Sequence, residues 1–283
     1  MKITQNFQNP NPTLYLVATP IGNLEDITLR AIRILKEVDY IFCEDTRHSR
    51  ILLEYYDIKN KLDSYFEFNK EVKGEKIISL LREGKSVALI TDAGTPGISD
   101  PGYEIAKLAI ELDFNVVPIP GASAILPALI TSGLIIQPFT FLGFLPRVEE
   151  KQKTLLNDYK YRAETLVIYE ASTRIYKTLE NISNVLGNRN ISIARELTKK
   201  FETIIRGSIN EIIENQPDII GECVIIVEGG DPKDYFKDLN IDDHVKHYLE
   251  LGYSEKDSMK RVAKDLGKSK SEIYELYKIR REK

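Results

Sequence analysis

Three apolar runs in the first half of the chain each end in a turn of small residues. The runs occupy 14–18, 87–90 and 115–119, and the turns that follow occupy 19–23, 92–97 and 121–124. Branched apolar runs of this length predict buried strands, and the amphipathic stretches between them predict helices. Strand, turn, helix and strand in succession is typical of a parallel sheet, in which the carboxyl ends of the strands meet at one edge. The sequence therefore predicts an α/β domain with a ligand pocket at that edge.

The turn after the run 87–90 is the richest in Gly and Pro. Residues 92–102 contain three Gly and two Pro, and Asp92 stands where the strand is expected to end. Glycine permits backbone conformations and close approaches that a side chain would block, so such a turn can present its amide N–H groups to a ligand. For this segment alone, a tight turn without a ligand is an equally good interpretation. The convergence with the other turns favours a pocket.

Further elements of the first half follow from turn signals and the spacing of apolar residues. We expect a strand at 40–43 that ends in the charged turn 44–47, and before it a helix that Asp26 caps. Residues 57–70 show no regular pattern and are expected to be irregular. Helices are predicted at 49–56, 71–82, 103–112 and 123–132.

The second half is expected to hold a mixed sheet and a helical end. Strands are predicted at 139–144, 165–169, 191–195, 202–206 and 223–227, with helices at 148–162 and 174–186. The closely spaced runs at 191 and 202 suggest a hairpin within this sheet. In the helical end, Ser254 and Asp257 resemble a capping box, and a last helix runs from Lys270 to Arg280. We place three domains at 1–122, 123–235 and 236–283.

The charge of the chain is unevenly distributed. The net charge is −4, but residues 256–283 contain ten Lys or Arg and five Asp or Glu, so this end carries +5. The acidic remainder argues against a general nucleic-acid-binding surface. The basic end is either a solvated helical surface or a binding patch, and its helices around Gly267 fit a helix-turn-helix or a simple antiparallel pair.

Cysteine and histidine limit the class of protein further. Cys43 and Cys223 lie in apolar runs, so we expect small buried side chains and neither a disulfide nor a metal site. His244 and His247 are expected on a solvated helix face, because no third ligand is near. The N-terminus has a single basic residue, Lys2, before the apolar run 14–18, which is too short for a secretory signal. The N-terminal sequence therefore predicts a cytoplasmic protein with no membrane partner.

Common catalytic motifs are absent. The chain contains no GxGxxG, GxxxxGK[ST], GxSxG, CxxC or HExxH pattern, which argues against the usual dinucleotide-binding enzymes, P-loop NTPases, α/β-hydrolases and zinc hydrolases. A polar, Gly-rich cleft with few nucleophiles suits a reaction in which an activated cosubstrate supplies the driving force and the protein supplies orientation. Group transfer from an activated donor fits this description.

Several long segments match a known family in sequence and in order. They are ATPIGNLEDITLRA (18–31), CEDTRHS (43–49), LITDAGTPGISDPG (89–102), PIPGASA (118–124), FLGFLPR (141–147), YEAS (169–172) and ARELTKKFE (194–202). These segments resemble the ribosomal RNA small subunit methyltransferase I family, whose members have the tetrapyrrole methylase fold and use S-adenosylmethionine. The basic helical end also resembles the family's small C-terminal domain.

The resemblance implies two α/β domains with the cofactor in the cleft between them, and a homodimer. It implies 2′-O-methylation of a cytidine ribose in the decoding region of 16S rRNA in the 30S subunit, with S-adenosylmethionine as cosubstrate and no metal. The cofactor contacts carried over from the family are Pro20, Asp92, Ala93, Gly94, Thr95, Ser123, Ala124, Tyr169 and Leu197. General tetrapyrrole methylases have a GDP-like turn where this chain has Asp92-Ala93-Gly94, which disfavours a corrin or sirohaem substrate.

A ribose hydroxyl is a weak nucleophile, so we expect in-line positioning with help from a base. Glu44 and Asp45 are the candidate bases, and Arg47 is a candidate for holding a phosphate. A solvated turn with an internal ion pair is the alternative for all three.

The path of the RNA is the least defined part of the prediction. Arg195, Lys199 and Lys200 are candidates for lining it, and a solvated charged hairpin is the alternative. Two competing functions stay open: a tetrapyrrole or precorrin methyltransferase of the same fold, and a non-enzymatic sensor of S-adenosylmethionine or a nucleotide.

Overall fold

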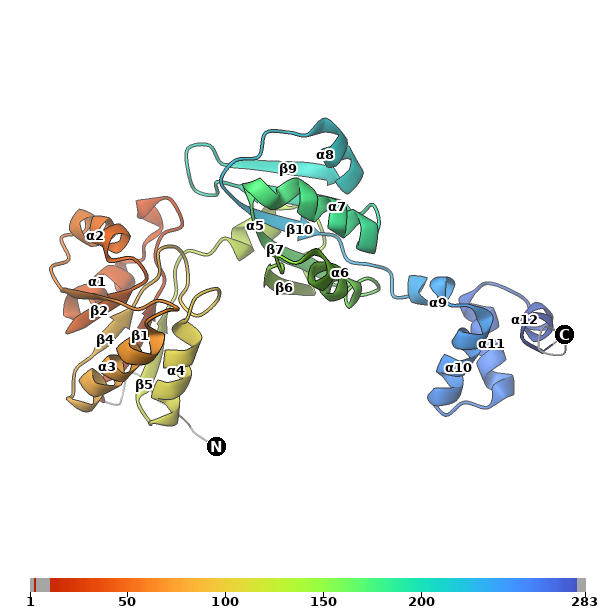
Figure 1. Ribbon diagram of the computed structural model, residues 1–283, viewed down its shortest axis with the longest axis horizontal. Coiled ribbons are helices and arrows are strands. Elements are labelled where there is room, and N and C mark those ends of the chain that lie inside the picture. The colour runs from red at the N-terminus through yellow and green to blue at the C-terminus, as the bar shows by residue number, and fades with distance from the viewer. Residues whose placement is uncertain (1–2, 4–10, 279–283) are drawn as a thin grey trace.

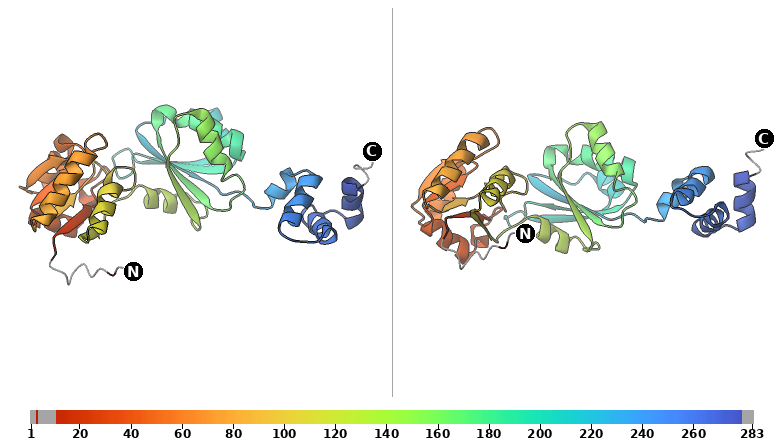
Figure 2. Two further views of the ribbon diagram at one scale, coloured as in Figure 1. Left: turned by 60° about the horizontal axis from the view of Figure 1, so that its bottom comes forward. Right: turned by 90° about the horizontal axis from the view of Figure 1, so that it is seen from below.

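The computed structural model describes residue 3 and residues 11–278. Two sheets and a C-terminal group of helices follow one another along the longest axis, and further views show the same separation (Figures 1 and 2). The predicted α/β architecture with a helical end is confirmed. No helix among the described residues combines the length and apolar character needed to cross a membrane.

The first sheet is parallel throughout. Its strands are β1 (Thr13–Val17), β2 (Tyr40–Cys43), β3 (Lys61–Ser64), β4 (Val87–Leu89) and β5 (Asn115–Ile119), in the order β3-β2-β4-β1-β5. Every neighbouring pair of strands is parallel. The carboxyl ends therefore share one edge, and the predicted convergence of the turns is confirmed.

Helices cover both faces of this sheet. One face packs against α1 (Leu29–Glu37) and α2 (Thr46–Tyr55), and the other packs against α3 (Lys70–Arg82) and α4 (Gly102–Glu111). Because strand side chains alternate between faces, Ile41 joins the core under α1 while Phe42 joins the core under α3.

Two local predictions in this half are wrong. Asp26 does not cap α1, because it lies in a 3-10 turn (Leu24–Asp26) and Thr28 is the N-cap, with its Oγ1 accepting from the Ala31 amide at 3.1 Å. The segment expected to be irregular contains β3. This edge strand reads KLDS and holds a single apolar residue, so it lacks the alternation that predicts a strand.

The second sheet is mixed, as predicted. Its strands are β6 (Phe139–Phe144), β7 (Thr165–Ala171), β8 (Asn190–Arg195), β9 (Thr203–Ser208) and β10 (Glu222–Val227), in the order β6-β7-β10-β8-β9. β6 and β7 are parallel, β8 and β9 form the expected hairpin, and β10 runs antiparallel to both β7 and β8. The central strand therefore begins at the edge where its two neighbours end.

The helices of the second half also cover both faces. α6 (Glu149–Asn157), α7 (Ile175–Leu186) and α8 (Ile209–Asn215) share the main core, and α5 (Ile125–Thr131) packs on the opposite face. A 3-10 turn (Ser172–Arg174) precedes α7. α6 is shorter than predicted, and α8 was not predicted, although Ser208 and Glu211 begin it with a capping box.

The C-terminal helices have a small core of their own. They are α9 (Asp234–Asp238), α10 (Ile241–Glu250), α11 (Glu255–Asp265) and α12 (Lys270–Lys278). Ser254 caps α11 as predicted, because its Oγ accepts from the Asp257 amide at 3.2 Å. The predicted extension of the last helix to Arg280 lies outside the described residues.

The prediction for His244 is wrong. Its side chain is 0% exposed, its Nε2 lies 3.1 Å from Asp265 Oδ2, and its ring stacks on Phe236. Burial lowers the pKa of His244. The histidine is thus part of the helical core, and only His247 keeps part of its surface in solvent.

The segment between β10 and α9 is packed against the second sheet's helices and loops. The Gly230 amide donates to the Arg162 carbonyl at 2.6 Å, and Arg189 Nη1 donates to the Glu228 carbonyl at 3.0 Å. The rings of Tyr161 and Tyr235 lie 5.4 Å apart. These contacts hold α9 beside the second half of the chain.

Candidate active site

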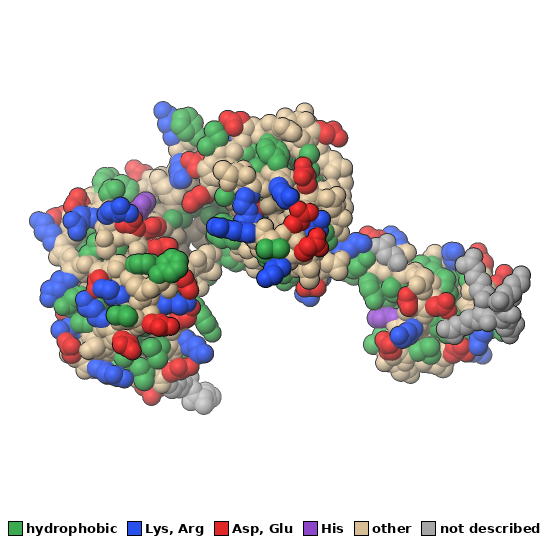
Figure 3. Space-filling model, in the orientation of Figure 1, with side chains coloured by type: hydrophobic (Ala, Val, Ile, Leu, Met, Phe, Trp, Pro, Cys, Tyr) green, Lys and Arg blue, Asp and Glu red, His purple; other side chains and the backbone are tan. Residues whose placement is uncertain are grey.

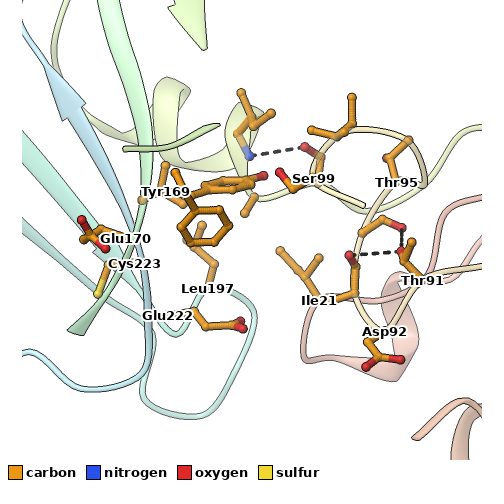
Figure 4. A pocket seen from close by; sticks show the side chains of 18 of the residues that line it. Ile21, Thr91, Asp92, Thr95, Ser99, Tyr169, Glu170, Leu197, Glu222 and Cys223 are labelled. Carbon is orange, nitrogen blue, oxygen red and sulfur yellow. Dashed lines mark hydrogen bonds between the residues drawn. The ribbon is translucent and has the colours of Figure 1, made fainter. Parts of the chain in front are cut away.

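A cavity of about 550 Å³ lies between the two sheets (Figure 4). The carboxyl edge of the first sheet forms one wall, and the ends of β7 and β8 together with the start of β10 form the other. Small-molecule sites typically measure about 300–1,000 Å³. The space therefore suits a ligand the size of a nucleoside cofactor.

The first wall is fixed by a backbone pair. Thr19 and Gly94 exchange two hydrogen bonds, with N–O distances of 2.9 and 3.0 Å. The Thr19 hydroxyl donates to the Thr91 carbonyl at 3.0 Å. This locks the turns after β1 and β4 together and places Ile21 and residues 91–95 at the cavity surface.

Gly94 has a backbone conformation that favours glycine. Its φ is +81°, which residues with a side chain rarely adopt, whereas an added Cβ would have ordinary space at 3.5 Å from Ile21 Cγ2. Its amide is already bonded to Thr19. The expectation that the Gly-rich turn offers its amides to a ligand is therefore wrong for Gly94.

Asp92 joins the ends of β4 and β2. Its Oδ1 accepts a hydrogen bond from the Asp45 amide at 3.2 Å. Glu44 also lines the cavity, and partial burial together with the charge of Asp92 raises the pKa of Glu44. A carboxylate with a raised pKa is a stronger proton acceptor.

Asp45 has a structural role outside the cavity. Its carboxylate caps α2 by accepting from the Arg47 amide at 2.8 Å, and it pairs with the Arg47 guanidinium, with Oδ2 and Nη2 2.7 Å apart. The hydrogen bonds from Arg47 hold the pKa of Asp45 well below its usual range. Glu44 is therefore better placed than Asp45 to accept a proton from a ligand in the cavity.

The second wall depends on the antiparallel course of β10. Cys223 pairs in register with Glu170 of β7 and with Arg195 of β8. Tyr169 packs edge-on against Phe144, with ring centroids 5.5 Å apart. Figure 4 shows Tyr169 and Leu197 on the side of the cavity opposite Ile21. This wall is mainly apolar and aromatic.

Glu170 is a buried carboxylate in this wall. It is 1% exposed, and its Oε2 accepts from the Thr178 hydroxyl at 2.7 Å and lies 3.4 Å from Arg174 Nη2. Its Oε1 accepts from the Ala171 amide at 2.9 Å. Arg174 also donates to the Leu145 carbonyl at 3.3 Å. The network ties the end of β7 to the segment after β6.

The lining of the cavity is acidic. Among the described residues, its carboxylates are Glu44, Asp92, Asp100, Glu170, Glu196 and Glu222. They face one lysine, Lys199, whose Nζ is 3.0 Å from Glu196 Oε1. A negative lining raises the local concentration of cations. The cavity therefore favours a ligand with positive charge.

Comparison with known proteins agrees with this architecture. The family model for Tetrapyrrole (Corrin/Porphyrin) Methylases matches residues 13–213. The Ribosomal RNA small subunit methyltransferase I of Halalkalibacterium halodurans is 46% identical over 286 residues, covering 98% of this chain and 99% of that protein. The chain belongs to the ribosomal RNA small subunit methyltransferase I family. The resemblance found in the sequence is confirmed.

Other relatives extend the comparison. The Bacillus subtilis member of the family is 46% identical over 275 residues, which is 94% of each chain. A crystal structure of uroporphyrin-III-C-methyltransferase from Thermus thermophilus aligns with a TM-score of 0.55 and 20% identity, covering 77% of this chain and 94% of that one. The latter likeness supports the tetrapyrrole methylase fold alone.

Most of the residues carried over from the family lie at the cavity. The predicted cofactor residues that line it are Asp92, Ala93, Gly94, Thr95, Ser123, Ala124, Tyr169 and Leu197. Pro20 is buried next to it, and its neighbour Ile21 lines the cavity instead. Glu44 and Lys199 line it too, whereas Asp45, Arg47, Arg195 and Lys200 do not. The roles of all these residues stay predictions.

Several lining residues were missed in the sequence. Glu222, Cys223 and Val224 line the cavity, but no motif marks them, since only the pairing of β10 brings them there. Phe144 and Glu170 lie inside segments that resemble the family, a signal that was available and unused. Burial raises the pKa of the Cys223 thiol to about 11, so this residue is a small apolar part of the wall.

Proposed function

We propose that the protein transfers a methyl group from S-adenosylmethionine to the 2′-hydroxyl of a cytidine ribose in the decoding region of 16S rRNA. The observation that carries the proposal is the acidic cavity between the two sheets in a chain that matches rRNA methyltransferases over nearly its whole length. The ribose hydroxyl and the cytidine are the finer part of the proposal and come from the resemblance. A ribosomal substrate also implies a cytoplasmic location.

The volume and the acidic lining of the cavity support the proposed cosubstrate. S-adenosylmethionine supplies a methyl group that is activated by its positively charged sulfonium sulfur. Asp92 would accept hydrogen bonds from ribose hydroxyls or the ammonium group, and Tyr169 and Leu197 would give an apolar surface for the adenine ring. Ser123 and Ala124 close the cavity where the chain crosses from the first sheet to the second.

Glu44 is our proposed general base. Its raised pKa and its place on the cavity wall suit removal of the proton from the attacking hydroxyl. The rest of the rate enhancement would come from holding the hydroxyl in line with the methyl group. Asp45 and Arg47 would shape the loop that carries Glu44, since Asp45 caps α2 and is paired with Arg47.

The proposed RNA surface has two parts, the loop after β8, whose Lys199 lines the cavity, and the C-terminal helices. Lys199 and Lys200 are on the loop between β8 and β9, and Arg195 is at the end of β8. The basic C-terminal helices are a second contact, with Lys260 and Lys264 on the exposed side of α11. Positive side chains at these places would meet phosphates that the acidic lining repels.

A homodimer is part of the proposal as well. The surface that supports it is an apolar face on α5 and the segment after it, where Leu126, Ile130 and Ile135 are all more than half exposed. Exposed apolar patches of this kind mark protein contacts. We assign this face to a second copy of the chain.

The decisive experiment is transfer of labelled methyl groups to 30S subunits that lack the modification. Label recovered in an alkali-resistant dinucleotide would establish 2′-O-methylation and leave the position to be mapped. Absence of label in a preparation that binds S-adenosylmethionine would refute the proposal. Activity on uroporphyrinogen or a precorrin would then favour the tetrapyrrole function, and binding without any transfer would favour a sensor.

A further inference from the structure

The loop between β8 and β9 forms part of the cavity wall and also carries an exposed aromatic ring. Glu196, Leu197 and Lys199 of this loop line the cavity, and Phe201 follows two residues later. The Phe201 side chain is 66% exposed, although a large apolar ring is normally buried. Most of the ring is therefore open to a ligand.

The loop is a structured tip. The Lys199 amide donates to the Glu196 carbonyl, and the Glu202 amide donates to the Lys199 carbonyl, both at 3.0 Å. The Thr198 amide donates to Glu202 Oε2 at 2.7 Å. Glu196 and Thr198 both have a positive φ, at +51° and +67°. These hydrogen bonds hold Phe201 in a defined position. The loop would therefore lose little conformational entropy when a ligand binds.

A lysine side chain lies close to the ring. Lys200 Nζ lies 5.5 Å from the centroid of the Phe201 ring. Figure 3 shows Lys or Arg side chains together with hydrophobic ones on the loop that protrudes from β8 and β9. Proteins that bind single-stranded nucleic acids combine an aromatic face with adjacent positive charge, because the base stacks on the ring while the phosphate contacts the cation.

We propose that Phe201 is a stacking platform for an unpaired nucleobase next to the methylated nucleotide. The inference rests on the proposed function, since it names a contact of that same RNA substrate. Sequence-specific proteins commonly bind RNA bases that are splayed out of a helix and stacked on aromatic side chains. A ribose that enters the cavity would leave its neighbouring bases outside it, and Lys200 and Phe201 directly follow Lys199, which lines the cavity.

The first test is affinity for unmodified 30S subunits and for a 16S rRNA fragment that contains the decoding region. Base stacking on an aromatic ring corresponds to roughly 5- to 150-fold in affinity. We expect Phe201→Ala to weaken RNA binding at least about tenfold, within that range. Phe201→Tyr should bind like the wild type. Affinity for S-adenosylmethionine should be unchanged in every variant, because Phe201 does not line the cavity.

Phe68 provides the matched control. It is 94% exposed, and the nearby Lys70 is paired with Glu67 and Glu104 at 2.7 and 2.8 Å. Phe68→Ala should leave RNA affinity unchanged. An equal loss in both variants would overturn the assignment, as would full affinity in Phe201→Ala. Retained affinity in Phe201→Leu would show that an apolar side chain of any shape suffices and would also overturn stacking.

The second test reports stacking directly. The chain contains no Trp, so Phe201→Trp introduces a single indole fluorophore. Saturation with the rRNA fragment should quench its emission, whereas Phe68→Trp should keep its emission. No quenching at saturating RNA would refute the inference even if the proposed function holds. Wild-type protein that neither binds nor methylates rRNA would instead refute the proposed function.

Discussion

The aliphatic part of the Lys199 side chain lies against the backbone of Gly22, so that a Cβ on Gly22 would be 2.5 Å from Lys199 Cγ. Gly22 belongs to the turn after β1, and Lys199 belongs to the loop after β8. The contact therefore joins the two sheets at the rim of the cavity. Ile21, the neighbour of Gly22, packs into the core that covers this face of the second sheet.

Substitution of Gly22 tests whether this contact sets the spacing of the two walls. Gly22 has a φ of +151°, so Gly22→Ala adds strain of about 1–3 kcal/mol to the clash with Lys199. We expect a lower melting temperature and a several-fold weaker affinity for S-adenosylmethionine. Lys199→Ala alone should have a small effect. The double variant should lose less than the sum of the two, because the clash is gone; strict additivity would show that the contact does not matter.

Asp92→Asn should weaken the binding of S-adenosylmethionine about tenfold or more, because hydrogen bonds to a charged group contribute about 1.5–3 kcal/mol. Asparagine keeps an oxygen that can accept from the Asp45 amide, so the loop should stay in place. Isothermal titration calorimetry measures the change. Asp63→Asn is the control, because Asp63 pairs with Lys73 and Lys76 away from the cavity. Equal affinities in the two variants would place the ligand elsewhere.

Glu44→Gln should lower kcat by about 10²–10⁴-fold with little change in cofactor affinity, as expected for loss of a general base. Asp45→Asn keeps an N-cap and should retain most activity. In the wild type, kcat should fall as the pH drops through the raised pKa of Glu44, since protonation removes the base. Single-turnover rates against pH test this. A Glu44→Gln profile that still falls in the same range would assign the titration to another group.

Removal of residues 240–283 should weaken RNA binding and leave cofactor binding nearly intact. The described part of this segment has its own core and lies apart from the cavity, and its residues 256–283 carry a net charge of +5. Filter binding of the rRNA fragment and calorimetry with S-adenosylmethionine measure the two affinities. Unchanged RNA affinity in the shortened protein would rule out a role for these helices in binding.

The stability of the C-terminal helices should decrease as the pH falls. His244 is buried, and burial lowers its pKa below the value of about 6.5 in the unfolded chain. Between these two values the unfolded state binds a proton that the folded state does not, so stability is present above pH 6.5 or so and is lost below it. The groups that face the ring are Asp265, Tyr248 and His247.

Hydrogen exchange in the full chain measures this effect. Protection factors for α10 and α11 should fall between pH 7.5 and 5.5, while those for β4 should not. His244→Gln removes the titrating group and should abolish the difference. A difference that persists in this variant would assign it to one of the other groups.

The success of the sequence-based prediction depended on how local each signal was. β1, β2 and β5 are buried runs bounded by turns, so each was placed within one residue of its observed ends. β3 was not predicted because an edge strand with one apolar residue shows no alternation of apolar and polar residues. Asp26 was predicted as the cap, whereas Thr28 caps the helix; both residue types cap helices, and only the geometry separates them.

Residues of the candidate site were likewise predictable only where a local sequence signal marks them. Asp92 and Ser123 follow strands that can be read from the sequence, so their place at the cavity could be anticipated. Glu222 and Cys223 reach it only because β10 inserts antiparallel between β7 and β8, and such long-range pairing leaves no local trace. The burial of His244 likewise depends on Phe236, which comes from a neighbouring helix.

The packing around the start of α9 fixes where the C-terminal helices begin relative to the cavity. Gly230 is bonded to Arg162, and Tyr235 rests beside Tyr161, so the C-terminal helices begin at a fixed place on the second half of the chain. Only residues 228–233 separate β10 from α9, a reach of about 20 Å even when extended. If these helices bind the RNA, the distance between their contact and the cavity is fixed. The protein would then select the nucleotide partly by its distance along the RNA from that contact.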